Sequence, residues 1–154
     1  MLKMTDSLLT FFIRNQIYAV PLNYVHHILP AVEITPFPDT PPEVAGIINF
    51  HGEIIPIFDV STLLHHPQET LTPSHQFLIL EAPGHHVGVI INQVKEVLSL
   101  RAIKDIDTKG PQHSGELIDS VFTFQHQLIF QLNPEKLFAI SKEISVVKTQ
   151  EVNV

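Results

Sequence analysis

The chain has 154 residues, of which 44% are hydrophobic and 16% charged, and its formal charge is −7 with the histidines neutral. An acidic chain with nine Lys and Arg residues is poorly suited to neutralising phosphates, so the charge argues against a nucleic-acid partner. The absence of cysteine excludes disulfides and thiolate chemistry, and no apolar run approaches the roughly 20 residues of a membrane-spanning helix. We therefore expect one soluble, cytoplasmic domain without a signal peptide or membrane insertion.

The first predicted elements are a hairpin and a short helix. Two apolar runs, Leu8–Ile13 and Ile17–Leu22, flank three polar residues, as the two strands of a hairpin do. Asn23 then precedes apolar residues at helical spacing, and a proline bars continuation at residue 30. The pattern predicts a helix of one to two turns over residues 23–29.

The central segment predicts a second hairpin. Apolar runs at Val44–Phe50 and Ile54–Val60 flank a His51-Gly52-Glu53 corner, and because the runs are nearly continuous we expect both faces of each strand to be covered. Asn49 is interpreted as a partner of backbone groups in the turn. Asp59 is interpreted as the cap of a short helical turn over residues 61–64.

The second half of the chain predicts two more hairpins, Gln76–Glu81 with His86–Ile91 and Ile118–Phe124 with Leu128–Leu132. A polar loop at His65–Ser74 splits the chain into roughly similar halves, which allows two small lobes. The remaining expectations are a short helical turn or strand start at Val94–Leu98, a polar loop at Lys104–Gly115, a short helix beginning at Pro134, and a polar tail from Lys142 that is frayed over Thr149–Val154. Four hairpins with short helices between them favour a mainly β fold with closed or nearly closed sheets.

Several segments occur in the order typical of one family. They are FFIRNQIYAVPLNYVHHIL, ITPFPDTPPEVAGIINFHGEIIPIFDV, FLIL, HHVGVIINQVKEVLSL and LIFQLNPEKLF. The chain resembles the CheW-like chemotaxis coupling proteins over about residues 8–139, followed by the polar segment 140–154. The resemblance implies a fold of two five-stranded SH3-like β-barrel lobes packed side by side.

The resemblance also implies a function without enzymatic chemistry or a cofactor. Such proteins are adaptors that couple chemoreceptors to a histidine kinase, by binding the regulatory domain of the kinase and the cytoplasmic tip of the receptor. An adaptor needs exposed apolar anchors, although for any one of them a place in the core is the alternative. The candidate partner-binding residues are Val25, His27, Ile28, Asn49, His51, Gly52 and Val87.

Two of these residues depart from the family pattern. The family usually has an Arg where this chain has His51, and often a Glu where it has His27; both positions are associated with coupling. Neutral histidines do not form the charge-assisted bond of an Arg–Glu pair. This leaves a divergent module of another signalling pathway as an alternative function. It also raises the hypothesis of pH-sensitive coupling, for which drift at a divergent interface is the simpler explanation.

Ten histidines invite a metal-site hypothesis, and their spacing does not support one. The adjacent pairs at residues 26–27, 65–66 and 85–86 chelate poorly, because neighbouring side chains on a strand or helix diverge. We therefore expect surface histidines in loops and no metal site, although ligands from distant segments and a His-based metal or ligand sensor remain open. Nucleophile elbows, phosphate-binding loops and dinucleotide fingerprints are absent from the sequence, so an enzyme is not expected.

Overall fold

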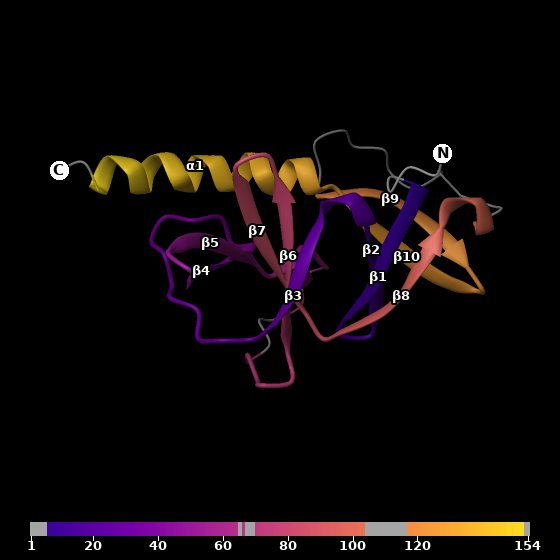
Figure 1. Ribbon diagram of the computed structural model, residues 1–154. Helices are drawn as coiled ribbons and strands as arrows, with labels where there is room; N and C mark the ends of the chain where they lie inside the picture. Colours follow the sequence, from indigo (N-terminus) through magenta and orange to yellow (C-terminus); the bar gives the residue numbers. More distant parts are fainter. Residues whose placement is uncertain (1–5, 65, 67–69, 104–116, 153–154) are drawn as a thin grey trace.

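The computed structural model describes residues 6–64, 66, 70–103 and 117–152. It contains two five-stranded sheets and a C-terminal helix that runs along one side of the molecule (Figure 1). The first sheet, here called lobe A, has the strand order β8-β1-β2-β10-β9, and the second, lobe B, has the order β3-β6-β7-β5-β4. The elements are β1 (Ser7–Ile13), β2 (Gln16–Pro21), η2 (Leu22–Tyr24), β3 (Val25–Pro30), β4 (Val44–Phe50), β5 (Glu53–Phe58), η3 (Val60–Leu64), β6 (Gln76–Ala82), β7 (His85–Ile91), β8 (Gln93–Ser99), η4 (Leu100–Ala102), β9 (Ile118–Phe124), β10 (Gln127–Leu132) and α1 (Pro134–Val152).

The four predicted hairpins are confirmed as the antiparallel pairs β1–β2, β4–β5, β6–β7 and β9–β10. The helical turn expected after Asp59 is the 3-10 segment η3. The Asp59 side chain is buried, and its Oδ1 accepts hydrogen bonds from the backbone N–H of Ser61 at 3.2 Å and from the Ser61 hydroxyl at 2.6 Å. The interpretation of Asp59 as a cap is therefore confirmed.

The helix predicted over residues 23–29 is wrong. Only the single turn η2 forms, and the chain then continues as strand β3, which pairs antiparallel with β6. Burial along β3 alternates residue by residue, so the period of two imposed by pairing with β6 overrides the local helical spacing. For Val94–Leu98, of the two expected alternatives the strand is confirmed, because these residues belong to β8.

The C-terminal helix is also longer than expected. The sequence predicts a short helix followed by a tail that frays from residue 149, whereas α1 has 19 residues and ends at Val152. Its buried residues Leu137, Phe138, Ile140 and Ile144 join the core between the lobes. The expectation of a loop at Lys104–Gly115 lies outside the described residues, as do positions 65 and 67–69 of the loop at His65–Ser74.

The two lobes are not the two halves of the sequence. Lobe B is one continuous segment from β3 to β7, and the loop between β5 and β6 lies inside it. Lobe A combines the first hairpin with β8, β9 and β10, because β10 pairs in parallel with β2 and β8 pairs antiparallel with β1. The division of the chain at His65–Ser74 is thus corrected: pairing between distant strands, which leaves no local signal, determines the lobes.

Three apolar cores explain why so many strands are apolar on both faces. One core fills lobe A, another fills lobe B, and the third lies between the lobes; we call it the shared core. On β6, Phe77 and Ile79 pack inside lobe B, whereas Leu78 and Leu80 face the shared core. The expectation of two covered faces holds for β5, which is buried from Ile55 to Phe58, while β4 alternates between buried and partly exposed residues.

Candidate functional site

The β4–β5 turn presents His51 and Gly52 at one end of lobe B. Both residues have positive φ angles, 52° and 85°, in a two-residue connection of the kind that suits a twisted hairpin. The Gly52 N–H donates to Asn49 Oδ1 at 2.9 Å, which confirms that Asn49 satisfies a backbone group of the turn. A Cβ on Gly52 would meet nothing within 4 Å, so the backbone conformation rather than crowding favours glycine here.

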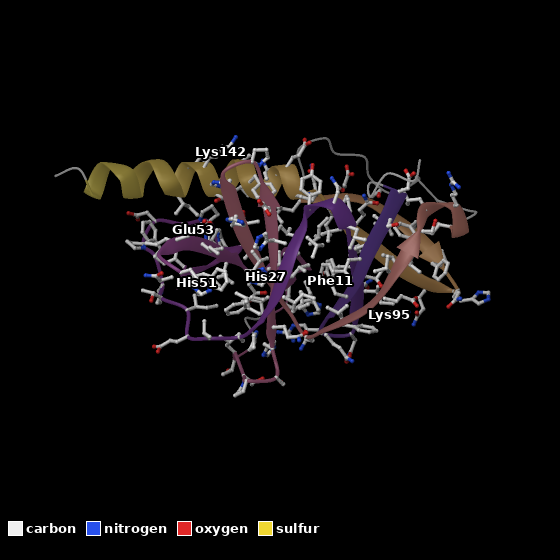
Figure 2. The ribbon with its side chains drawn as sticks, viewed as in Figure 1. Phe11, His27, His51, Glu53, Lys95 and Lys142 are labelled. Carbon is white, nitrogen blue, oxygen red and sulfur yellow. The ribbon has the colours of Figure 1, made fainter. Side chains whose placement is uncertain are left out.

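The structure brings His27 and His51 to one face of lobe B, from β3 and from the β4–β5 turn (Figure 2). The Phe50 ring lies beside both, with its centroid 5.2 Å from the His27 ring and 4.2 Å from the His51 ring. Burial lowers the pKa of His27, and the neighbouring histidines 26, 51 and 86 lower it further. Phe50 was not singled out from the sequence, because its contact with His27 joins residues that are distant in the chain.

Two further histidines lie on the same face, and each is close to a glutamate. His86 Nδ1 lies 2.5 Å from Glu53 Oε2, and His26 Nε2 lies 3.5 Å from Glu81 Oε2. The expectation that the histidines occupy loops is corrected for His26, His27, His85 and His86, which lie on strands β3 and β7. We call the five residues His26, His27, His51, His86 and Phe50 the histidine face.

The candidate apolar anchors divide into exposed and buried residues. Ile28 is 36% exposed on the edge strand β3, and Val25 packs partly against the shared core. Val87 is 0% exposed and belongs to the shared core, so its assignment as a partner-binding residue is corrected. The alternation of β7 points Val87 and Val89 at the shared core, an orientation that the sequence left open because β7 is apolar at most positions.

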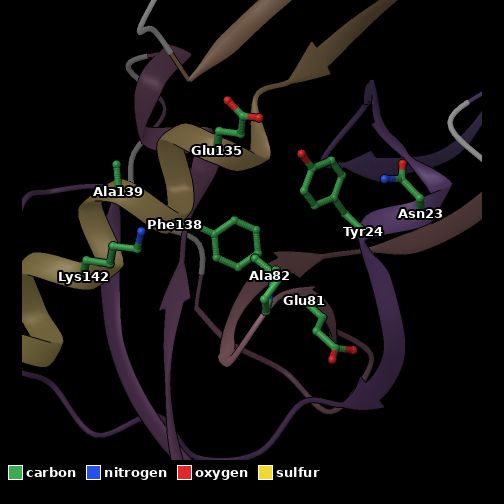
Figure 3. A pocket seen from close by; sticks show the side chains of 9 residues that line it. Asn23, Tyr24, Glu81, Ala82, Glu135, Phe138, Ala139 and Lys142 are labelled. Carbon is green, nitrogen blue, oxygen red and sulfur yellow. The ribbon is translucent and has the colours of Figure 1, made fainter.

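A groove of about 750 Å³ opens between α1, η2 and the β6–β7 hairpin (Figure 3). Tyr24 and Phe138 form its apolar floor with ring centroids 6.2 Å apart, while Glu81, Glu135 and Lys142 line it with charge. Burial raises the pKa of Tyr24, and the nearby Glu135 carboxylate raises it further. The sequence does not predict this groove, because the residues that line it come from three segments that are distant in the chain.

Comparisons with known proteins identify the family to which this sequence is similar. A family model described as a CheW-like domain matches residues 7–142. The chemotaxis protein CheW of Treponema pallidum (strain Nichols) is 28% identical over 147 residues, an alignment that covers 90% of this chain and 84% of that protein. The chemotaxis protein CheW of Rhizobium meliloti (strain 1021) is 28% identical over 94 residues, 61% of each protein.

A solved structure shares the fold. The crystal structure of scaffolding protein TtCheW from Thermoanaerobacter tengcongensis superposes with a TM-score of 0.67 at 23% identity, over 86% of each chain. At 23% identity, this similarity shows that the two proteins share a fold, and it shows nothing beyond the fold. No helix in the part of the chain that the structure describes is long and apolar enough to cross a membrane.

Proposed function

Because the chain belongs to the CheW-like domain family, we propose that it is a non-enzymatic adaptor of chemotaxis signalling that couples chemoreceptors to a histidine kinase. Its partners in this proposal are the regulatory domain of the kinase and the cytoplasmic tip of the receptor, which places the protein in the cytoplasm. Both partners are bound by protein–protein contacts alone.

The shared core is the observation that carries the proposal. It takes buried side chains from both sheets and from α1, including Phe11 of lobe A, Leu78 of lobe B and Leu137 of α1. Interiors packed in this way are close to incompressible, so the lobes behave as one rigid body. Two partners on different faces of such a body are held in a fixed relation, which is what transmission of receptor state to a kinase requires.

The surface proposed for one partner is the histidine face together with Ile28, Asn49 and Gly52. Ile28 lies on the edge strand of lobe B, where an apolar side chain is accessible to another protein. His27 and Phe50 add ring surface beside it, and the β4–β5 turn projects His51. Aromatic rings and branched aliphatic side chains are suitable anchors at the centre of an interface.

Binding by calorimetry to the kinase regulatory domain and to a receptor tip fragment tests this surface. Ile28→Asp is expected to weaken one of the two partners by at least about tenfold, since it places a charge at an apolar contact. Leu128→Asp is the matched control, because Leu128 is exposed at 55% on the other lobe. Retained binding of both partners by Ile28→Asp contradicts this surface, and failure of the wild-type chain to bind either partner contradicts the adaptor function.

Exchanging the residues at positions 27 and 51 distinguishes a chemotaxis adaptor from a family member that serves another signalling pathway. His27→Glu with His51→Arg introduces the pair that the resemblance associates with coupling. A chemotaxis adaptor is expected to bind its own kinase and receptor without this exchange. If the wild-type chain ignores both and only the double variant binds them, a divergent signalling module is the better assignment.

A further inference from the structure

Three side chains with metal-binding atoms meet on the histidine face although they come from three strands. They are His26 on β3, Glu81 on β6 and His86 on β7, and one ligand atom from each lies within 4.8 Å of the others. Glu81 and His86 are direct partners in the β6–β7 register. The register of β3 against β6 shifts between Val25 and His27, so His26 occupies an irregularity of the kind that re-aims a side chain.

The ring of His86 is oriented as a metal ligand requires. Its Nδ1 lies 2.5 Å from Glu53 Oε2, and when Nδ1–H donates to this carboxylate the neutral imidazole carries its lone pair on Nε2. This Nε2 is shielded from solvent and makes no hydrogen bond within the described residues, and the nearest Glu81 oxygen, at 3.9 Å, is too far for one. In metal sites, a histidine ligand commonly binds a carboxylate through one ring nitrogen and the metal through the other. His86 has this arrangement, with Glu53 at Nδ1 and with Nε2 directed toward His26 and Glu81.

His26 is held in a similar way. Its Nδ1 lies 2.6 Å from the Nδ1 of His27, and its Nε2 is directed at Glu81, 3.5 Å from Oε2. The rings of His26 and His86 meet edge to face with centroids 4.8 Å apart. His26 and Glu81 are exposed at 37% and 48% of their side chains, which leaves an ion a path from solvent and leaves both side chains free to adjust.

We propose that His26, Glu81 and His86 bind a divalent transition-metal ion, for which Zn²⁺ is the reference, and that Glu53 positions the His86 ring. Two imidazoles and one carboxylate suit such ions, and three protein ligands leave a fourth position for water. Ligand atoms around Zn²⁺ lie about 3.3 Å apart, so closure from the present spacing needs only small side-chain rotations. This inference does not rest on the proposed adaptor function.

Calorimetric titration of the full chain with ZnCl₂ tests the site. The wild-type protein is expected to show one binding step that His26→Asn, Glu81→Gln and His86→Gln each weaken at least tenfold. His126→Gln is the matched control, because it removes an exposed histidine from the β9–β10 turn of the other lobe. Circular dichroism shows whether each variant is folded, and only folded variants are compared.

A second readout separates this site from general histidine binding. Co²⁺ bound by the three residues gives a visible absorption band, which the three ligand variants lose and His126→Gln keeps. Glu53→Gln is expected to weaken Zn²⁺ binding about 10- to 100-fold while retaining all three ligands. The site is wrong if the ligand variants bind Zn²⁺ as the wild type does, or if His126→Gln weakens binding equally. Unchanged affinity in Glu53→Gln overturns the positioning role of Glu53.

Discussion

The rings of His27 and His51 both lie beside the Phe50 ring, although 23 residues separate the two histidines in the chain. The hairpin turn brings His51 back beside the edge strand that carries His27. These are the two positions at which the chain departs from the family pattern. The resemblance leads us to expect a charge-assisted Glu–Arg pair at these two positions. In this chain the two side chains instead contact the apolar Phe50 ring, a contact that neutral histidines can make.

The stability of the protein is expected to fall as the pH is lowered from about 7.5 to about 5.5, partly because of His27. The pKa of His27 is lowered in the folded state by burial and by the surrounding histidines. The unfolded chain, whose histidines have ordinary pKa values near 6.5, therefore binds more protons in this range. Stability contributed by neutral His27 is present above about pH 6.5 and decreases below it.

Urea unfolding at the two pH values measures this effect. His27→Gln is expected to lose less stability than the wild type between them, because one group with a lowered pKa has been removed. An equal pH dependence in His27→Gln and the wild type would show that His27 does not carry the effect.

Removing the Asp59 carboxylate is expected to destabilise the fold. Asp59 is 8% exposed, and its Oδ1 accepts two hydrogen bonds from Ser61. Asp59→Ala leaves both buried donors without a partner and should lower the free energy of unfolding by about 1–3 kcal/mol. Asp119→Ala, at an exposed position of β9, should change it by less than about 0.5 kcal/mol in the same urea titration.

A methyl group at Gly46 should be tolerated poorly. The chain after β3 closes lobe B by pairing Thr35 with Ile47 through backbone hydrogen bonds of 2.9 and 2.8 Å. A Cβ on Gly46, whose φ angle is 153°, would lie 2.4 Å from the Thr35 carbonyl oxygen. Gly46→Ala therefore must displace the closing segment in addition to adopting a positive φ, whereas Gly52→Ala meets no atom and adds only the strain of a positive φ, about 1–2 kcal/mol.

Thermal unfolding of the two glycine variants measures the additional cost of the contact at Gly46, because both variants carry the strain of a positive φ. Gly46→Ala is expected to have the lower midpoint of the two. The reverse order would mean that the closing segment yields easily and that lobe B does not depend on the contact between Thr35 and Ile47.

Val87 should matter for stability and not for partner binding. Truncation of this fully buried side chain removes two methyl groups from the shared core, so Val87→Ala should cost about 2 kcal/mol. Val97→Ala is the matched control, since Val97 is 52% exposed on β8 and its loss should be close to neutral. Unfolding followed by fluorescence or circular dichroism measures both, and weakened partner binding by folded Val87→Ala would restore it as a contact residue.

Local chemistry was sufficient to predict much of the fold. Alternation, apolar runs and turn residues located all four hairpins, the helical turn after Asp59 and the hydrogen bond of Asn49 within its turn. Each of these features is determined by residues within a few positions of one another. The same local patterns were misleading at β3, where pairing with β6 replaced a helix by a strand.

The sequence by itself determined a mainly β chain, its hairpins and, through the ordered segments of residues 8–139, its resemblance to a family of adaptors. Only the tertiary structure decided which strands share a lobe, that Val87 is buried, and that His26, Glu81 and His86 meet. The physical reason is that hairpins depend on neighbours in the chain. Lobes, cores and metal-binding clusters instead depend on the pairing of distant strands, whose register no local pattern records.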